Sequence, residues 1–286
     1  MLRDSHLVPL LPSATAINRR QPWQNLLLER HAVSAIEIPE HEHRDFCLHL
    51  QTAGSDAMEW WSEGRHNVES TRRGAMILLP PGTRDRLLWH GDSKRLILSF
   101  SSALLQRMVE ESGTSLPAFR SQWALDDPAL ANLVGEMGRE AAEGWPLGNL
   151  YADLIAAGFA SMLVRRHAAD KVKLDDRKGG LAASSLRIAM EFITANLDRD
   201  LHLDEIAQQL SLSSFHFARE FRSSTGQTPY QYLLEQRIAR AKQLLRGSDW
   251  PVQQIAELTG FRSPVNFIRA FRQRTGQTPA AWRLSA

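Results

Sequence analysis

The chain has 286 residues, of which 43% are hydrophobic and 23% charged, and its formal net charge is +2. That length is sufficient for two domains with separate cores. No stretch approaches the ~20 unbroken apolar residues of a membrane-spanning helix, and Pro9 and Pro12 break the apolar patch near the start, which argues against a signal peptide. Cys47 is the only cysteine, which excludes an internal disulfide, and we expect a cytoplasmic protein.

Short strand-like runs fill the region from about residue 22 to residue 101. They include AVSAIEI (32–38), DFCLHLQ (45–51), AMILLP (75–80) and RLILSF (95–100), and turn signals such as Pro80-Pro81-Gly82 separate them. Strands at this spacing predict a small β-barrel or sandwich. Two helices are predicted after them, at 126–142 and 148–168, and the second carries an apolar stripe through Leu150, Leu154, Phe159, Met162 and Leu163.

Residues 169–184 contain charge runs and a Gly-Gly pair without apolar periodicity, which is typical of a linker. The sequence therefore predicts an α+β multidomain protein: a β-rich domain with following helices at 1–168, a linker at 169–184 and an all-α domain at 185–286. Residues 185–286 have a formal net charge of +4, whereas the rest of the chain has −2. This asymmetry points to a polyanionic partner for the C-terminal domain.

A duplicated segment dominates the C-terminal domain. FAREFRSSTGQTP at 217–229 returns as FIRAFRQRTGQTP at 267–279, and the copies agree at nine of thirteen positions. Such self-similarity indicates that one structural unit is used twice.

Each copy is predicted to be a helix, a tight turn and a second helix. In the first copy the helices cover 204–210 and 214–224, with Ser214 as the cap; in the second they cover 252–260 and 264–274. Ile255, Ala256 and Leu258 are expected to take the roles of Ile206, Ala207 and Leu210. Phenylalanines four residues apart, Phe217 with Phe221 and Phe267 with Phe271, share one face and are expected to be core residues.

A predicted helix at 230–247 joins the two units. Its length of ~27 Å approaches the ~34 Å between successive major grooves on one face of DNA.

The doubled FxRxFRxxTGxTP pattern and the joining helix resemble the DNA-binding domain of AraC/XylS-type transcription regulators. The resemblance covers roughly 186–286 and implies that each unit places its second helix in a major groove of double-stranded DNA. On matching positions it implies base contacts from Ser214, Phe215, Ala218, Arg219, Val265, Asn266 and Arg269, and phosphate contacts from Arg222, Arg262 and Arg272. Ala218 is too small for a bidentate base contact, so the first unit is expected to read less sequence. Glu220 is expected at the surface, and Arg222 and Arg272 have solvation or ion pairing as the alternative.

The N-terminal domain has features that resemble a cupin barrel. His41 and His43 lie in PEHEHRDF, and Gly74, Pro80 and Gly82 follow in GAMILLPPGTRD, whereas Asp85 stands where metal-binding cupins have a third histidine. We expect no metal and no cofactor. The alternative is a metal-dependent cupin enzyme carrying a DNA-binding tail, in which His41, His43 and Asp85 form a two-histidine, one-carboxylate iron site.

A ligand pocket is the interpretation preferred for this barrel. Its candidate effector-binding residues are His41, His43, Trp60, Arg84 and Trp89, and the alternatives are core packing for the aromatic residues and solvent exposure for Arg84. Adjacent Trp60 and Trp61 must point to opposite faces of a strand. Cys47 is either a redox sensor or inert packing.

The resemblance also implies the remaining partners. Residues 1–20 would form an arm that contacts the effector, and the 148–167 stripe would form a homodimer or else pack on the barrel. The sequence thus predicts an effector-responsive, sequence-specific DNA-binding regulator, an activator that contacts RNA polymerase, and not an enzyme or a membrane protein.

Overall fold

The computed structural model describes residues 2–3, 6–7, 15–16, 22–23, 25–54, 56–109, 115–170 and 179–285. The chain forms two compact units, one of residues 1–144 with 158–175 and one of 145–157 with 176–286. The boundary differs from the expected one because residues 145–157 join the C-terminal unit. Residues 171–178, half of the predicted linker, lie outside the described residues.

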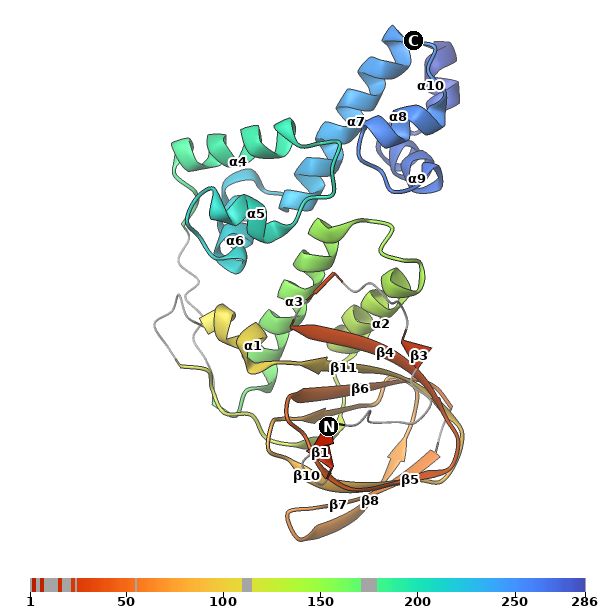
Figure 1. The fold of residues 1–286 in the computed structure, drawn as a ribbon, viewed down its shortest axis with the longest axis vertical. Helices are drawn as coiled ribbons and strands as arrows, with labels where there is room; N and C mark the ends of the chain where they lie inside the picture. Colours follow the sequence, from red (N-terminus) through yellow and green to blue (C-terminus); the bar gives the residue numbers. More distant parts are fainter. Residues whose placement is uncertain are drawn as a thin grey trace. The chain divides into compact units, whose positions relative to one another are not determined.

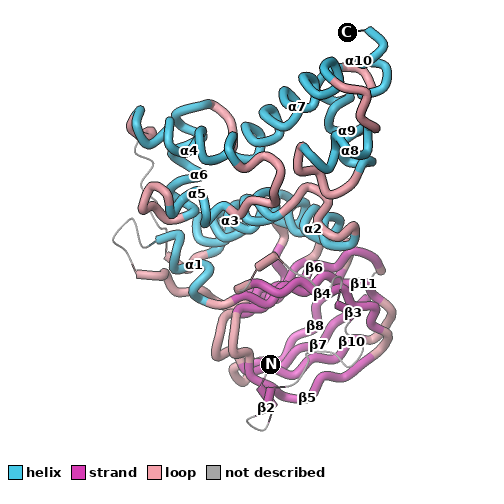
Figure 2. Tube along the Cα trace, turned by 45° about the horizontal axis from the view of Figure 1, so that its top comes forward, coloured by secondary structure: helices cyan, strands magenta, loops and turns pink. Residues whose placement is uncertain are grey.

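Two antiparallel sheets form the N-terminal unit (Figures 1 and 2). The first sheet has the strand order β2-β1-β5-β10-β7-β8, with β1 Leu2–Arg3, β2 His6–Leu7, β5 Ile36–Glu42, β7 Asp56–Ser62, β8 Arg65–Thr71 and β10 Arg84–Trp89. The second has the order β12-β9-β6-β11-β4-β3, with β3 Thr15–Ala16, β4 Leu26–Val33, β6 Phe46–Ala53, β9 Met76–Leu79, β11 Ser93–Phe100 and β12 Gln122–Leu125.

The second sheet is covered on both faces. Its inner face contributes Cys47, Ile77 and Ile97 to an apolar core shared with the first sheet, and helix α2 packs on the outer face against β4, β6 and β11. Strands buried on both faces read as unbroken apolar runs, which explains why the runs at 45–51, 75–80 and 95–100 were predictable. The run at 32–38 is the exception, because β4 ends at Val33 and β5 begins at Ile36.

Three helices follow the strands: α1 Ser102–Val109, α2 Pro128–Ala142 and α3 Asn149–His167. The two predicted helices are confirmed, and α1 was not predicted. Asp127 caps α2 by accepting from the backbone N–H groups of Ala129 and Leu130. Gly138 allows α2 to approach β11, because a Cβ atom there would lie 2.5 Å from a methyl carbon of Leu96.

The apolar stripe of α3 is used within the chain. Phe159 packs edge-on against Phe100, with ring centroids 5.1 Å apart, and Leu163 is buried. Leu150 belongs to a core cluster of the C-terminal unit. The stripe therefore contributes to the cores of both units: Phe159 contacts the barrel, as the alternative to a dimer interface expected, and Leu150 and Leu154 pack with the C-terminal helices.

The C-terminal unit adds seven helices: α4 Ala183–Ala195, α5 Leu203–Gln208, α6 Ser214–Thr225, α7 Pro229–Gly247, α8 Val252–Leu258, α9 Pro264–Thr275 and α10 Pro279–Ser285. In Figure 1, α7 runs from the α4–α6 group to the α8–α10 group. Leu233 of α7 packs in the core of the first group, and Leu234, Ile238, Ala241 and Leu245 pack in that of the second. Among the described residues no helix has both the length and the apolar character to cross a membrane.

Arg237 is the one charged residue of α7 that is buried among those described. Its guanidinium donates to the backbone oxygens of Leu197 at 2.9 Å and Arg199 at 2.7 Å, and burial lowers its pKa. These bonds tie the middle of α7 to the segment that follows α4.

Candidate functional site

The first helix-turn-helix consists of α5, a turn and α6. Phe217 and Phe221 are fully buried and pack with Ile206 and Ala207 in one cluster, as predicted. Ser211 in the turn has a left-handed backbone, with φ of 52°. The cap differs from the prediction: Ser213 accepts the backbone N–H of His216, whereas the Ser214 hydroxyl donates to Asp204.

The second unit, α8, a turn and α9, repeats this arrangement with one correction. Phe267 and Phe271 are fully buried with Ile255 and Ala256. Leu258, however, is 43% exposed, and the buried position belongs to Thr259. The Thr259 hydroxyl donates to the carbonyl of Ile255 at 2.6 Å, so a polar residue enters this core with its hydrogen bond satisfied.

The turns of the two units differ in length by one residue. The N–H of Leu212 donates to Ala207 in the first unit, and the N–H of Phe261 donates to Ala256 in the second. Counted from these donors, α6 begins two residues after Leu212, at Ser214. In the second unit α9 begins three residues after Phe261, at Pro264.

The outer face of α6 carries two exposed arginines. Arg219 donates to the carboxylate of Glu220 at 3.0 Å, and Arg222 forms no ion pair with any described residue. Ser214 and Phe215 are half-buried, and Ala218 packs partly on the core. Glu220 was expected at the surface but is only 6% exposed, because it lies between Arg219 and His216, whose ring nitrogen is 3.8 Å away.

The outer face of α9 is more open. Val265 is 73% exposed, Arg269 and Arg272 are exposed, and Arg269 donates to the side-chain oxygen of Asn266 at 3.0 Å. An apolar side chain this exposed contributes little to a core. It is instead suited to contact a thymine methyl group.

Arg262 is exposed, and its guanidinium has partners within the C-terminal unit. It pairs with Asp200 and donates to the backbone oxygen of Trp145 at 3.0 Å and to the side chain of Asn149 at 2.9 Å. Asn266 also donates to the backbone oxygen of Pro146, at 3.4 Å. Arg262 and Asn266 thus have protein partners in this structure, as do Ser214, Arg219 and Arg269 among the predicted DNA-contacting residues.

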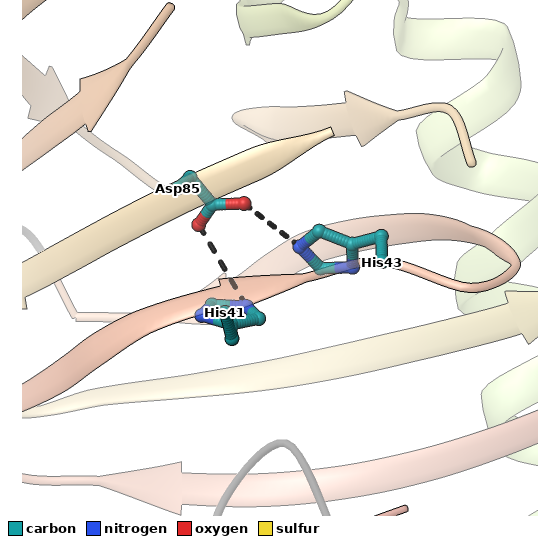
Figure 3. A group of neighbouring side chains, drawn as sticks. All are labelled: His41, His43 and Asp85. Atoms are coloured by element: carbon teal, nitrogen blue, oxygen red, sulfur yellow. Dashed lines mark ion pairs between the residues drawn. The ribbon is translucent and has the colours of Figure 1, made fainter. Parts of the chain in front are cut away.

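Three of the sequence candidates meet inside the N-terminal unit. His41, His43 and Asp85 are all buried, and their side chains point toward one another (Figure 3). The Nε2 atom of His43 lies 3.0 Å from one oxygen of Asp85, and that of His41 lies 3.8 Å from the other. Burial lowers the pKa of His41, against the opposing effect of Asp85, which favours a neutral imidazole.

The other candidate effector-binding residues, Trp60, Arg84 and Trp89, do not form one site. Trp89 is fully buried in the core and Trp60 is 8% exposed, whereas Trp61 stacks on His66 outside, so the adjacent tryptophans do face opposite ways. Arg84 is exposed and pairs with Glu42 at 2.8 Å, which is the solvent-facing alternative. Of the candidate effector residues only Trp60 lines an open pocket of about 590 Å³.

That pocket contains residues that the sequence interpretation missed. Trp123 of β12 stacks on Trp60 with ring centroids 4.6 Å apart, and Arg65, Arg120, Thr83 and Ser121 add polar groups to the lining. No short-range pattern singles out Trp123, because it reaches the pocket only through the pairing of β12 with β9.

Cys47 lies deeper in the same unit. It is buried, its sulfur lies 3.2 Å from Nε2 of His49, and burial raises the pKa of its thiol. A thiol that resists ionisation is a poor nucleophile, so packing is the better interpretation. Burial also lowers the pKa of His49.

The comparisons with known proteins agree with the duplicated units. A family model described as a helix-turn-helix domain matches residues 206–285. The HTH-type transcriptional activator RhaR of Shigella dysenteriae is 26% identical over 262 residues, which cover 85% of this chain and 86% of that protein, and RhaR of Escherichia coli strain K12 gives the same values.

Several solved structures similar to this chain are DNA-binding domains that cover about a third of it. The DNA-binding domain of AdpA, crystallised with a target DNA, is 36% identical and covers 35% of this chain and 91% of its own, with a TM-score of 0.34. A regulator from Chromobacterium violaceum with an AraC-type DNA-binding domain is 32% identical, with coverages of 35% and 90% and a TM-score of 0.34. Because relatives named as transcriptional activators match along most of both chains, and the helix-turn-helix family match falls on the duplicated units, this chain is a DNA-binding transcription regulator similar to the AraC/XylS type.

Proposed function

We propose that this regulator binds double-stranded DNA in the cytoplasm as a homodimer and activates transcription, through contact with RNA polymerase, when a small-molecule effector occupies its N-terminal unit. The observation that carries the DNA contact is the pair of exposed arginines at equivalent places, Arg222 and Arg272. Cations that lack carboxylate partners are suited to bind phosphates, and their repetition matches a partner that presents the same surface twice. The name of the RhaR relatives supports the activating role.

Base reading is assigned chiefly to α9. Val265, Asn266 and Arg269 occupy the first half of its outer face, and a recognition helix contacts base edges mainly with its N-terminal residues. On α6 the corresponding contacts come from Ser214, Phe215 and Arg219. Ala218 contributes little, since it is partly packed on the core.

The sequence preference of the full-length protein tests this assignment. Binding sites are selected from random duplexes with the wild type, Arg269→Ala and Arg274→Ala. We expect Arg269→Ala to lose base preference in one block of the site. Arg274 of the same helix is a matched control because it pairs with Glu235 of α7 at 2.8 Å, and its loss should leave the preferred sequence unchanged. Unchanged preference in Arg269→Ala would contradict the assignment.

The effector is assigned to the open pocket beside Trp60 and Trp123. Stacked indole rings favour flat aromatic ligands or sugar faces, and Arg65 and Arg120 add charges that complement an anionic group. The histidines at 41 and 43 and Trp89 lie deeper and do not line this pocket.

A thermal-shift screen with sugars, small aromatic compounds and carboxylates tests the effector. A ligand of the native state at 100 times its Kd stabilises it by about 2.7 kcal/mol. Trp123→Leu should abolish the shift, whereas Trp61→Leu, on the outer face, should keep it. A hit that survives Trp123→Leu would place the effector elsewhere, and sedimentation of the full-length chain would test the homodimer.

A further inference from the structure

Two neighbouring strands bring three ligand-type side chains to one point. Asp85 of β10 lies directly opposite His41 of β5 in the antiparallel register. His43 follows two residues after His41, and alternate residues of an extended chain face the same side. The three ligand atoms all lie within 4.8 Å of one another, and Figure 3 shows the side chains converging.

The spacing suits a shared cation. Two ligands ~2.1 Å from one metal ion lie about 3.0 Å apart at a right angle and at most about 4.2 Å apart. The two measured nitrogen-to-oxygen separations, 3.0 Å for His43 and 3.8 Å for His41, fall inside this range. The widest separation is at most 4.8 Å, so a shared ion requires these two side chains to move closer by about 0.6 Å.

The converging atoms lack hydrogen-bond partners among the described residues. These atoms are Nε2 of His41, Nε2 of His43 and both carboxylate oxygens of Asp85. The 3.0 Å contact between His43 and Asp85 does not have hydrogen-bond geometry. Native structures rarely leave several buried polar atoms unsatisfied at one place, and such atoms call for an ion or another bound group.

The carboxylate adds an electrostatic reason. The side chain of Asp85 is fully buried, and its strand places Leu87 and Trp89 in the apolar core. Burial of a carboxylate in such surroundings is costly unless a cation compensates it. No arginine or lysine among the described residues forms an ion pair with Asp85, so a bound cation would supply that charge.

His41 is already oriented as a ligand. Its Nδ1–H donates to the backbone oxygen of Pro39 at 3.0 Å, because a carbonyl can only accept. This bond fixes the tautomer in which Nε2 carries a lone pair, and that lone pair lies beside Asp85. A metal-bound histidine usually donates its other ring N–H in this way.

We propose that His41 Nε2, His43 Nε2 and the Asp85 carboxylate bind one divalent transition-metal cation inside the N-terminal unit. Two imidazoles and one carboxylate favour iron, manganese, cobalt, nickel or zinc over magnesium or calcium. Three protein ligands leave coordination positions open for water or a small ligand. This site goes beyond the proposed function, which involves DNA and a small-molecule effector. Because cation binding is measured without either of them, the two proposals are tested independently.

A second histidine cluster must be separated from this one. On the surface, Glu59 accepts from His66 at 2.9 Å and from His90 at 2.7 Å. In this second cluster the Glu59 carboxylate is paired with both histidines, and His66 and His90 are exposed. Surface histidines nonetheless bind transition metals weakly, so they supply the matched control.

The experiment uses untagged full-length protein stripped with a chelator and titrated with Co²⁺ and Zn²⁺, followed by calorimetry and by the visible absorption of Co²⁺. Wild type and the double variant His66→Gln/His90→Gln should each bind one equivalent. Asp85→Asn and His43→Gln should bind at least 100-fold more weakly. Circular dichroism establishes that both variants are folded, and Asp85→Asn removes a buried charge and should retain its fold.

Two outcomes would overturn the site. One is a wild-type protein that binds neither cation, or loses its single equivalent in His66→Gln/His90→Gln. The other is folded Asp85→Asn and His43→Gln that retain wild-type affinity.

Discussion

Arg222 and Arg272 occupy equivalent places on α6 and α9, one helical turn after Arg219 and Arg269. The second arginine of each pair forms no ion pair with the described part of the chain, unlike Arg219, which contacts Glu220. A guanidinium without a protein partner can neutralise a phosphate and release a condensed counterion. These two residues should therefore govern the salt dependence of DNA binding more than its sequence preference.

Removal of either arginine makes this measurable. Arg222→Ala and Arg272→Ala should each weaken binding to all sequences about equally and reduce the slope of log K against log salt by about 1. Fluorescence anisotropy across a salt series with full-length protein gives the slope. Arg187→Ala, which removes an exposed arginine of α4, is the control, and an equal loss of slope there would show a general charge effect.

Single residues also mark where sequence interpretation succeeds. The four phenylalanines were predictable because their spacing places them on one helical face. Glu220 and Thr259 were not, because a carboxylate and a hydroxyl are expected at the surface unless their partners are known. Arg219 and His216 supply those partners for Glu220, and the carbonyl of Ile255 does so for Thr259.

The turns of the two units carry different residues at the same left-handed position. Ser211 has φ of 52° and Gly260 has φ of 74°. Serine is tolerated in the first turn at a modest cost in strain. In the second turn a Cβ atom on Gly260 would lie 2.1 Å from the backbone oxygen of Leu197 and 2.6 Å from Arg237, so glycine is required by space as well as by conformation.

A pair of glycine variants separates these two effects. Gly226→Ala tests conformation alone, because φ is 75° there and nothing lies within 4 Å of the added Cβ; it should lower the free energy of unfolding by about 1 kcal/mol. Gly260→Ala should lower it by more than about 3 kcal/mol, because backbone must also move. Denaturant titration of both variants checks this. Equal losses in the free energy of unfolding would mean that Leu197 and Arg237 move aside at no cost.

The strands show the same limit of prediction. Those of the second sheet were found because burial on both faces gives apolar runs, as in β6. In contrast, β8 is exposed along most of its length and β10 alternates between buried and partly exposed positions. Polar residues such as Arg65 and Arg84 hide these strands in the sequence, although β10 supplies Asp85.

The pKa shifts of the histidines predict opposite pH dependences of stability for the two units. In the C-terminal unit, the hydrogen bond from Asp153 raises the pKa of His202, with Asp200 and Glu205 also facing it. A raised pKa in the folded state gives stability that is full below the unfolded value near 6.5 and is lost as pH rises through the folded value. In the N-terminal unit, burial lowers the pKa of His41 and His49, so stability there is lost as pH falls below about 6.5.

His202→Gln isolates the C-terminal contribution. The variant should be destabilised relative to wild type more at pH 6 than at pH 8.5, because the protonated imidazole gains more from Asp153 than the neutral imidazole does. Denaturant unfolding of full-length protein at both values measures the difference. Asp153→Asn removes the partner and should give the same trend; a deficit that grows with pH would reverse the assigned sign.

The division into a β-rich part and a helical DNA-binding part could be predicted, because strand texture, helical periodicity and the duplication are all visible in the sequence. The pocket proposed for the effector could not, since Trp60 and Trp123 meet only when β12 joins the sheet. Likewise, residues 145–157 were assigned to the first domain because they precede the linker, yet Asn149 and Asp153 bond to Asp200, His202 and Leu203.

The DNA contacts proposed for α6 and α9 imply that helix α7 restricts the promoters that this protein can regulate. Its 19 residues pack into both helix-turn-helix cores, and Arg237 ties its middle to the end of α4. The two reading helices therefore have a fixed separation, so the contacted base pairs must keep a fixed helical phase. Insertion of about 5 base pairs, half a turn of B-DNA, between the two contacted blocks would turn one block to the far side of the duplex. A promoter could then change many bases between the blocks during evolution, but gain or loss of a few base pairs there would abolish regulation.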